Sequence, residues 1–381
     1  MRSTFAGLET ARRALFAQQA ALQTTAHNIA NANTPGYSRQ RVNFNATQPY
    51  AHPGFNNPVT PGQVGTGVEA GTIQRIRRDF LDVQYRGENT KYGYWETRSQ
   101  ALSKMENILK EPSDNGLSKA FTRFWKSLED LANNPENDGT RSTVRQRGIA
   151  LAKTFHYLSN SLSQVRGDIQ NQLDVTVKEV NSLADQINSI NQQISRVEPH
   201  GYLANDLYDK RDLLVDKLSE LVNVKVTPVE SGGNSLDIAE GRYTIKIVAD
   251  NGDTYTLVDG ESLETNEFMV DFDDGNGNAS FSVNGDPVSG VISGKLQGLK
   301  EANNKLYPEM LDELDVMAKS FVKAFNSVHK NGSDLNGDPG GEFFAIPNNG
   351  ERAAQSIKVV LEDDELDQIA ASNDGSVGDG G

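Results

Sequence analysis

One long run of regularly spaced apolar residues restricts the fold of this chain more than any other feature. Between residues 151 and 197, apolar side chains recur at steps of three and four, which is the period of one helix face. They are Leu151, Phe155, Leu158, Leu162, Val165, Ile169, Val180, Leu183, Ile187, Ile190, Ile194 and Val197. At 3.6 residues a turn, the stretch predicts a helix of about 13 turns. Leu173 and Val177 fall out of phase, as in a stutter that locally unwinds a supercoil.

Shorter helices are predicted on both sides of this long one. The stretch 79–110 has the same period, and its expected core positions are Phe80, Val83, Leu102, Met105 and Leu109. Three more stretches each place leucine or phenylalanine on one face: 117–131, 205–222 and 295–329. In the stretch 205–222 the residues expected to point inward are Leu207, Leu214, Leu218 and Leu221. The helical stretches together predict a rod.

Residues 224–292 have a different pattern. Short runs such as "YTIKIVAD" and "TYTLVDG" are separated by Asp, Asn and Gly turns, and this spacing favours antiparallel strands. We expect an elongated, multidomain α+β protein in which a coiled-coil-like helical rod carries an inserted antiparallel β-domain. The expected domains are an N-terminal core helix at residues 1–35, the rod at 36–223 and 293–345, the β-domain at 224–292 and the start of a further segment at 346–381.

The first helix carries a narrow apolar stripe. Leu8, Leu15, Leu22 and Ile29 stand at strict intervals of seven, which is the repeat of a coiled-coil seam. The other residues of this helix are mostly small or polar, so the stripe must find its cover on another helix. A core helix of an ordinary domain is the alternative interpretation.

The sequence "NIANANTPGYSRQ" (residues 28–40) ends this helix. Pro35 disfavours the helical conformation of the residue before it, and Gly36 permits a turn. An extended segment is expected to begin at Tyr37. The asparagines of the motif can satisfy backbone groups at the helix end or contact a neighbouring subunit: Asn28, Asn31 and Asn33.

The sequence gives no support for catalysis, a cofactor or a metal site. It has no cysteine, and its five histidines are scattered without metal-ligand spacing. The stretch 334–342 begins with the alternating oxygen ligands of an EF-hand loop, but Pro339 and Ala345 stand where that loop needs glycine and glutamate. A tight Asx-type turn is expected there, with weak calcium binding as the alternative. We therefore predict a protein that is not an enzyme.

Net charge and the N-terminus restrict the environment of the chain. Its 52 acidic and 37 basic residues give a net charge of −15, which disfavours nucleic acid or an anionic membrane surface as a partner. No apolar run approaches the roughly 20 residues that span a bilayer. Glu9, Arg12 and Arg13 interrupt the place where a signal peptide has its apolar segment, so no cleaved signal is expected.

The segment "HNIANANTPGYSRQRV" resembles a motif shared by bacterial flagellar axial proteins, which include rod, hook and hook-associated subunits. Further segments occur in the order seen in the family of flagellar hook-associated protein 1, the hook-filament junction subunit. They are "GVEAGTIQRIRRDFLDVQYR", "GLSKAFTRFWKSLEDLANNPENDGTRSTVRQRG", "ANDLYDKRDLLVDKLSELVNVKV" and "FNSVHKNGSDLNGDPGGEFF". Because this order is more specific than any single motif, the chain is identified as similar to that family over most of residues 1–345.

The resemblance implies a structural role as a mechanical adaptor between the flexible hook and the rigid filament. The implied partners are further copies of the chain in a helical tube, the hook protein, the second hook-associated junction protein and a flagellar export chaperone. The implied location is extracellular, in the flagellum, reached by type III export without a cleaved signal. The implied assembly interface consists of Leu8, Leu15, Leu22, Ile29, Asn28, Asn31, Asn33, Pro35, Gly36 and Tyr37.

The C-terminal end departs from the family pattern. Members close with a helix rich in Gln, Ala and Tyr that pairs with the N-terminal helix, whereas this sequence ends in "GDGG". We expect it to be incomplete at the C-terminus, where the chaperone site is also expected. Residues 1–35 are expected to be disordered in the monomer. The alternative functions are another axial subunit of the hook or rod type and, from a different class, a secreted adhesin or enzyme with a coiled-coil stalk.

Overall fold

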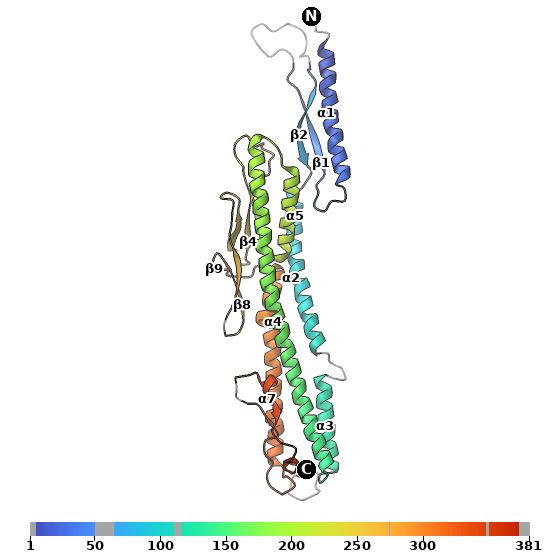
Figure 1. Ribbon diagram of the computed structural model, residues 1–381, viewed down its shortest axis with the longest axis vertical. Helices are drawn as coiled ribbons and strands as arrows, with labels where there is room; N and C mark the ends of the chain where they lie inside the picture. Colours follow the sequence, from blue (N-terminus) through green and yellow to red (C-terminus); the bar gives the residue numbers. More distant parts are fainter. Residues whose placement is uncertain (1–4, 50–64, 110–115, 274, 348–349, 373–381) are drawn as a thin grey trace. The chain divides into compact units, whose positions relative to one another are not determined.

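The computed structural model describes residues 5–49, 65–109, 116–273, 275–347 and 350–372 (Figure 1). Residues 1–4 of the predicted N-terminal segment and residues 348–349 and 373–381 of the last one lie outside this description. The protein belongs to the α+β class and has two compact units. Unit 1 comprises Met1–Tyr94, Thr176–Val270 and Phe281–Gln297, and unit 2 comprises Trp95–Val175, Asp271–Ser280 and Gly298–Gly381.

The long helix predicted from the apolar period is confirmed and is longer than expected. Helix α4 (Asp138–Val197) has 60 residues and buries most of the predicted apolar positions. It begins well before residue 151, and the inward positions of its first turns are Arg141, Val144 and Arg145, all of them buried. Gly148 is the next inward residue, and a Cβ on it would lie 2.8 Å from the Phe343 ring. An apolar pattern does not detect inward positions that are filled by arginine and glycine.

Unit 1 begins with a helix on a hairpin. Helix α1 (Phe5–Ala30) lies along β1 (Gln40–Ala46) and β2 (Val68–Arg75), which are antiparallel with Val42 opposite Ile73 (Figure 1). The same unit contains α5 (Asn205–Leu221), which follows a short 3-10 helix at Glu198–His200. Leu218 and Leu221 of α5 are buried as predicted, whereas Leu207 and Leu214 are half-buried.

The predicted strands of residues 224–292 are confirmed and belong to two small sheets. The first is antiparallel in the order β3 (Val224–Val229), β4 (Arg242–Val248), β5 (Thr254–Asp259) and β6 (Glu264–Thr265). The second has the order β7 (Phe268–Phe272), β8 (Ala279–Val283) and β9 (Asp286–Pro287). Asparagines of α4 hold these strands: Asn191 pairs with both backbone groups of Tyr243, and Asn181 with both backbone groups of Phe268.

Helix α2 (Asp79–Leu109) is present, but most of its predicted core is wrong. Phe80, Val83 and Leu102 are 77, 69 and 44% exposed, and only Met105 is fully buried among the predicted positions. The inward face instead carries mainly small or polar residues: Arg86, Thr90, Gly93, Thr97 and Ala101. A Cβ on Gly93 would lie 2.2 Å from the Glu220 carbonyl oxygen, so α2 and α5 approach too closely for large side chains.

Unit 2 is built around an aromatic core. Helices α3 (Leu117–Asn133) and α7 (Tyr307–Asn331) pack with the unit 2 part of α4 and with the segment that carries β10 (Phe344–Ala345), α8 (Ala353–Ser356), β11 (Lys358–Val359) and a 3-10 helix at Leu366–Gln368. Seven phenylalanines meet there: Phe121, Phe124, Phe155, Phe321, Phe325, Phe343 and Phe344.

The helix predicted at 295–329 is interrupted. Helix α6 (Gly294–Glu301) continues into α7 through a π-helical turn, Ala302–Leu306. Pro308 follows this turn, and because proline has no N–H it leaves the carbonyl four residues before it without its helical bond. Asn304, the residue at that position, uses its side chain to bind both backbone groups of Ala279. The apolar period alone does not reveal this interruption.

The stretch 334–342 forms the predicted Asx-type turn. The Asp334 Oδ1 atom accepts the backbone N–H groups of Asn336 and Asp338, at 2.8 and 2.9 Å. One carboxylate oxygen is therefore already bonded to the backbone of its own turn.

Candidate assembly surface

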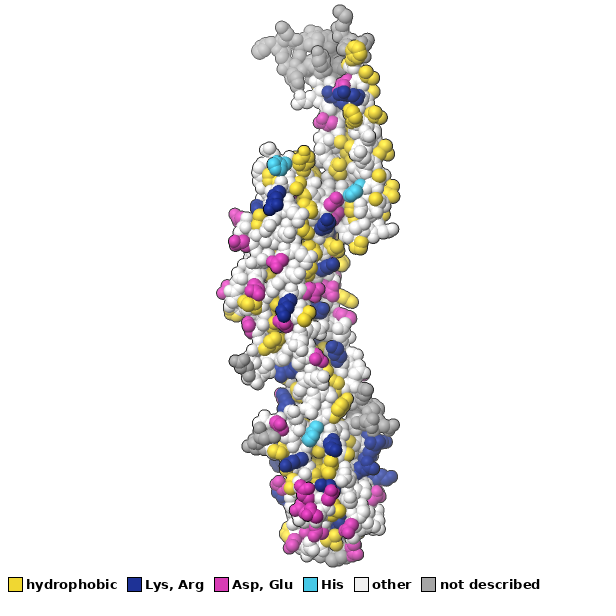
Figure 2. Space-filling model, viewed as in Figure 1, with side chains coloured by type: hydrophobic (Ala, Val, Ile, Leu, Met, Phe, Trp, Pro, Cys, Tyr) yellow, Lys and Arg dark blue, Asp and Glu magenta, His cyan; other side chains and the backbone are white. Residues whose placement is uncertain are grey.

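Helix α1 has two unlike faces. The face toward the hairpin carries mostly small side chains, with Ala17 and Thr24 buried. The opposite face carries large apolar side chains: Phe5, Leu8, Leu15, Phe16, Leu22 and Ile29, which are 59–73% exposed. Figure 2 shows them as a line of apolar atoms along the outer edge of α1. Exposed apolar patches of this kind mark sites of association, since burying one leucine or isoleucine fully is worth about 1.5–3 kcal/mol.

We call Leu8, Leu15, Leu22 and Ile29 the apolar seam. Sequence reasoning identified all four residues but assigned no role to Phe16, which is 59% exposed. Phe16 stands next to Leu15 and so widens the apolar stripe by one residue. Its signal was present in the sequence, because a phenylalanine beside a seam position broadens the apolar face of a helix.

Asn28 fixes the reversal of the chain after α1. Its Nδ2 atom donates to the Gln40 carbonyl at 2.9 Å, and its Oδ1 atom accepts the Gln40 N–H at 2.8 Å. The same oxygen accepts the Tyr37 hydroxyl at 2.8 Å. The side-chain amide therefore pairs with both backbone groups of one residue, as a neighbouring strand would. Asn28 thus has a local role in the turn.

The remaining motif residues form or border the turn itself. Asn31 donates both its backbone N–H and its Nδ2 to the His27 carbonyl, each at 3.1 Å, near the end of α1. The Tyr37 N–H donates to the Thr34 carbonyl at 3.2 Å across Pro35 and Gly36. Gly36 has φ +80°, as the third residue of a type II turn requires. Asn33 and Pro35 are exposed at this turn.

Arg75 of the hairpin binds α5 through a buried ionic contact. Its Nη1 lies 2.8 Å from Asp209 Oδ1 and its Nη2 lies 2.5 Å from Asp212 Oδ2, and the guanidinium also bonds both oxygens of Glu240. The Arg75 side chain is 4% exposed. Asp209 in addition accepts the backbone N–H of Ser38 at 2.9 Å. The base of the hairpin is thus held to α5 by charge.

The arginines around Asp212 decide its protonation. Burial alone would raise the pKa of this carboxyl, but Arg75, Arg77, Arg211 and Arg86 outweigh burial and hold its pKa below the usual range. Such a site stays charged in the folded state. The loss of one partner from a buried ionic group of this kind typically costs about 3–5 kcal/mol.

Sequence reasoning missed this ionic network because it treated α5 as an apolar helix. Asp209, Asp212 and Asp216 recur at steps of three and four, which is the signal of a charged helix face. The matching arginines Arg75 and Arg77 stand two residues apart in "RIRRDF". Arg77 and Asp209, the nearest residues of the two patterns, lie 132 positions apart in the sequence, so neither pattern alone indicates that they meet.

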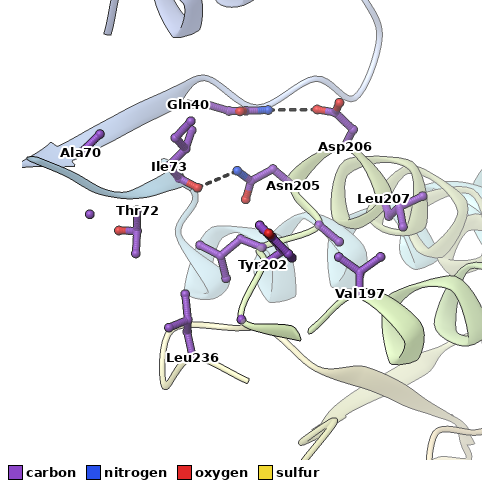
Figure 3. A pocket seen from close by; sticks show the side chains of 14 residues that line it. Gln40, Ala70, Thr72, Ile73, Val197, Tyr202, Asn205, Asp206, Leu207 and Leu236 are labelled. Carbon is purple, nitrogen blue, oxygen red and sulfur yellow. Dashed lines mark hydrogen bonds between the residues drawn. The ribbon is translucent and has the colours of Figure 1, made fainter. Parts of the chain in front are cut away.

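An open groove of ≈ 570 Å³ lies beside this joint (Figure 3). It runs between β2 and the start of α5, with Tyr202 and Leu236 on its other sides. Gln40 donates to Asp206 at 2.9 Å and Asn205 donates to the Ile73 carbonyl at 2.7 Å across it. Because these bonds link the hairpin to α5, we interpret the groove as part of the joint.

Within the described ranges, no group of three or more His, Asp or Glu side chains is arranged to hold a metal ion. Of the helices in the part of the chain that the structure describes, none combines the length and the apolar character needed to cross a membrane.

Two known families match parts of the chain. The family described as "Flagellar hook-associated protein FlgK helical domain" matches residues 102–344. The family described as "Flagella basal body rod protein" matches residues 8–37, which is the range of α1 and its turn.

Individual relatives agree with the larger match. Flagellar hook-associated protein 1 of Bacillus subtilis is 47% identical over 358 residues, which covers 90% of this chain and 71% of that protein. Its counterpart in Salmonella typhimurium is 30% identical over 334 residues, which covers 87% of this chain and 58% of that protein. The solved structure of the flagellar hook junction protein FlgK from Burkholderia pseudomallei has a TM-score of 0.59 and 25% identity, and covers 70% of this chain and 47% of that one.

Proposed function

Because this chain belongs to the flagellar hook-associated protein FlgK family, we propose that it is a structural subunit of the bacterial flagellum that assembles with copies of itself into the hook-filament junction. There it acts as a mechanical adaptor between the flexible hook and the rigid filament, a role that needs no enzymatic activity and no cofactor. Repeated heterologous contacts that do not close into a ring generate such helical assemblies.

The apolar seam of α1 carries this proposal. Its side chains are about two-thirds exposed while the small side chains of the same helix pack on the hairpin. A helix normally buries its large apolar residues, so this arrangement suits a surface that is covered only on assembly. We propose a C-terminal helix of the full-length protein as the cover. The relatives named above are longer than this chain, which spans 71 and 58% of their lengths.

The finer arrangement is part of the same proposal. Residues 1–35 form the inner layer of the tube, the rod at 36–223 and 293–345 forms the wall, and residues 224–292 face outward. The segment 346–381 begins a further part. Around the turn, Asn33 and Pro35 are exposed and are available to a neighbouring subunit, together with the seam.

Partners and location follow from the same role. The proposed neighbours are copies of the chain, the hook protein and the second hook-associated junction protein. We propose that a flagellar export chaperone binds the C-terminal part and that type III export carries the protein to the cell exterior. The rod-type match at residues 8–37 favours an axial position in general, whereas the helical-domain match at 102–344 favours the junction.

Deletion of the gene tests the proposed function directly. We expect cells that retain hooks, lack filaments and release unpolymerised flagellin into the medium, with full recovery when the full-length gene is restored. Cells that keep normal filaments after deletion would refute the junction role.

Substitutions in the seam test the observation behind it. Leu15→Glu and Leu22→Glu in the full-length protein are expected to abolish filament formation, because each places a charge in a surface that must become buried. Both side chains are exposed in the single chain, so its thermal unfolding should not change. Gln23→Glu is the matched control and should restore filaments, because Gln23 is exposed and is not three or four residues away from any seam residue. Equal recovery by all three variants would contradict an interface at the seam.

Amide hydrogen exchange tests the predicted disorder of residues 1–35 before assembly. We expect fast exchange there in the isolated monomer, because the seam has no cover, and slow exchange in assembled flagella. Full protection in the monomer would show that the first helix is ordered before assembly.

A further inference from the structure

We propose that exposed arginines at the base of the hairpin dock on an acidic loop of a second copy of this chain. The arginine patch consists of Arg39, Arg41 and Arg78, and the acidic loop is residues 361–368. This inference rests on the proposed self-assembly and adds to it one specific contact between subunits.

The arginine patch lies along the start of the hairpin. Arg41 is opposite Gln74 in the β1–β2 register, and the Arg39 carbonyl accepts the Ile76 N–H at 2.8 Å. Residues two apart on an extended strand face the same side, so Arg39 and Arg41 share one face. Arg78 stands two residues after Ile76 and begins the first turn of α2, where its carbonyl accepts the Leu81 N–H at 2.9 Å. All three arginines are exposed.

These three arginines differ from the neighbouring arginines of the described structure, which form ion pairs with carboxylates. Arg75, Arg77, Arg86 and Arg211 are all ion-paired, and together they use the acidic residues of α5 and its surroundings: Asp82, Asp209, Asp212, Asp216 and Glu240. Within the described ranges, no carboxylate lies within ion-pair distance of Arg39, Arg41 or Arg78. In a chain with a net charge of −15, three exposed arginines together form a local exception to the prevailing charge.

The acidic loop has the opposite composition and a fixed backbone. It carries five carboxylates within six residues: Glu362, Asp363, Asp364, Glu365 and Asp367. Two buried arginines of α4 hold its backbone, because Arg145 donates to the Leu361 carbonyl at 2.6 Å and Arg141 to the Leu366 carbonyl at 3.1 Å. Arg141 also donates to the Ile369 carbonyl at 2.6 Å.

The way in which Arg141 and Arg145 bond the loop determines which of its charged groups stay exposed. Arg141 bonds carbonyl oxygens of the loop and not its carboxylates. Among the residues that the structure describes, Asp363 is the one loop carboxylate with an ion pair, to Arg145 at 2.5 Å. Glu362 and Asp364 are exposed. The loop therefore presents negative charge from a defined place, which is what docking on a fixed arginine patch requires.

The chemistry of the two surfaces points to a second copy as the partner. Complementary charged patches steer encounter and fix the register of an interface, and each single exposed pair contributes little, so several charges on each side are needed. The patch belongs to unit 1 and the loop to unit 2. A contact between different surfaces of two identical chains is heterologous, and it can repeat from copy to copy, as the proposed helical assembly requires.

Cross-linking in assembled flagella tests the contact itself. Residues 1–381 contain no cysteine, so within them the introduced thiols are the only ones. In this test, full-length Arg41→Cys and Asp364→Cys proteins are to be co-expressed in a deletion strain, and the isolated flagella are to be treated with a short bismaleimide. A cross-linked dimer of this protein is expected only from the mixture. Arg41→Cys with Glu106→Cys, which uses an exposed acidic position of α2, is the matched control. A dimer yield no higher than in that control, or a cross-link to a different protein, overturns the proposal.

Charge reversal tests the pairing. Arg39→Glu with Arg41→Glu, and separately Glu362→Lys with Asp364→Lys, should each lower the fraction of cells with filaments at least tenfold. The four substitutions together should restore it. Lys104→Glu with Lys126→Glu makes the same change of charge as the arginine pair, at other exposed positions, and should have no effect. Normal filaments in both half-variants, or no recovery in the combined variant when it is exported and folded, overturn this contact. Neither result affects the proposed junction role, which the deletion tests.

Discussion

The base of the hairpin in unit 1 and the core of unit 2 hold helices to extended chain with opposite chemistry. In unit 1, the Arg75 guanidinium meets the carboxylates of Asp209, Asp212 and Glu240. In unit 2, the Phe124 ring packs against four other phenylalanine rings at centroid distances of 5.3–6.1 Å. The stability of the hairpin base depends on the presence of every charged partner. The stability of the unit 2 core depends on the volume that its rings fill.

This difference determines how each region tolerates change. An apolar cluster loses stability in proportion to the area and volume removed. A buried ionic group adds little net stability when complete, because desolvation offsets attraction, but is strongly destabilising when one partner is removed. The ionic joint also fixes direction, since bonds from a planar guanidinium to carboxylates have a defined geometry. Substitutions in the two regions can therefore separate the two mechanisms.

The largest effect is expected in the aromatic core. Phe124→Ala should lower the free energy of unfolding of unit 2 by about 3–5 kcal/mol, because it removes a ring that is only 2% exposed and leaves a cavity. Denaturant titration can follow Trp95 and Trp125, which both belong to unit 2. Arg123→Ala, at the exposed neighbouring position, is the control and should change stability by less than about 0.5 kcal/mol. Similar losses in both variants would argue against a volume-filling core.

The next effect is expected at the ionic joint. Arg75→Met keeps most of the side-chain length but removes the charge, and should destabilise unit 1 by about 3 kcal/mol. This is the low end of the range for a broken buried pair, because Asp212 keeps its contact with Arg86 at 3.2 Å. Amide exchange in β2 and α5 should accelerate while exchange in unit 2 stays unchanged.

The control for this variant uses the facing strand. Arg41→Met makes the same substitution at an exposed arginine and should leave exchange unchanged. Asp209→Asn added to Arg75→Met should cost less than the two single losses together, because it removes a carboxylate that Arg75→Met has already left without its arginine. Strict additivity would mean that the two residues do not act as a pair.

Apolar periodicity predicted the regions whose inward positions are apolar and failed where they are not. It identified α3, most of α4 and the strands of residues 224–292, because their inward faces carry Leu, Ile, Val or Phe. It misplaced the start of α4, where Arg141 and Arg145 point inward, and missed the charged face of α5. On α2 it chose the large residues, although α5 comes so close at Gly93 that no larger side chain fits at that position.

The candidate site was predicted in the same uneven way. The apolar seam follows from spacing alone, since a heptad repeat is a local property of the sequence. The Asn28 clamp joins residues 12 positions apart and the Arg75 contact joins residues 137 positions apart. Polar side chains can bond partners in many directions, so their spacing does not specify which segment they meet until the fold is known.

Asparagine clamps occur in both units and allow a matched test. Asn326 of unit 2 pairs with both backbone groups of Phe344, as Asn28 does with Gln40. Asn326 is buried and Asn28 is only half-buried. Asn326→Ala should cost about 2–3 kcal/mol, because it leaves buried backbone groups unpaired. Asn28→Ala should cost at most about 1 kcal/mol, because water can replace the Asn28 side chain and residues 1–35 are expected to be disordered before assembly. Urea titration of both variants measures the difference, and equal losses would show that burial does not determine the strength of the clamp.

The smallest effect is a difference in acid sensitivity. Burial lowers the pKa of His329 in unit 2, against the hydrogen bond to the Gly341 carbonyl. The neutral ring accepts the Ala370 N–H on Nε2 at 3.0 Å, a bond that protonation would remove. Because the folded pKa lies below the unfolded value of about 6.5, the unfolded chain binds the proton first. Stability is thus full above that pH and falls below it, by at most about 1.4 kcal/mol per pH unit.

Unit 1 should behave differently over the same window. The pKa of Asp212 is held low by its arginines although burial opposes them, so its contribution is lost only below the unfolded value of about 3.9. Burial raises the pKa of Asp216 despite Arg86, which acts in the opposite sense and increases stability as pH falls. Between about pH 6.5 and 4.5, the amide protection factors of unit 2, which are corrected for the intrinsic pH dependence of exchange, should fall while those of unit 1 do not. His329→Gln should remove most of this loss of protection, and an unchanged pH profile in that variant would assign the acid sensitivity to another group.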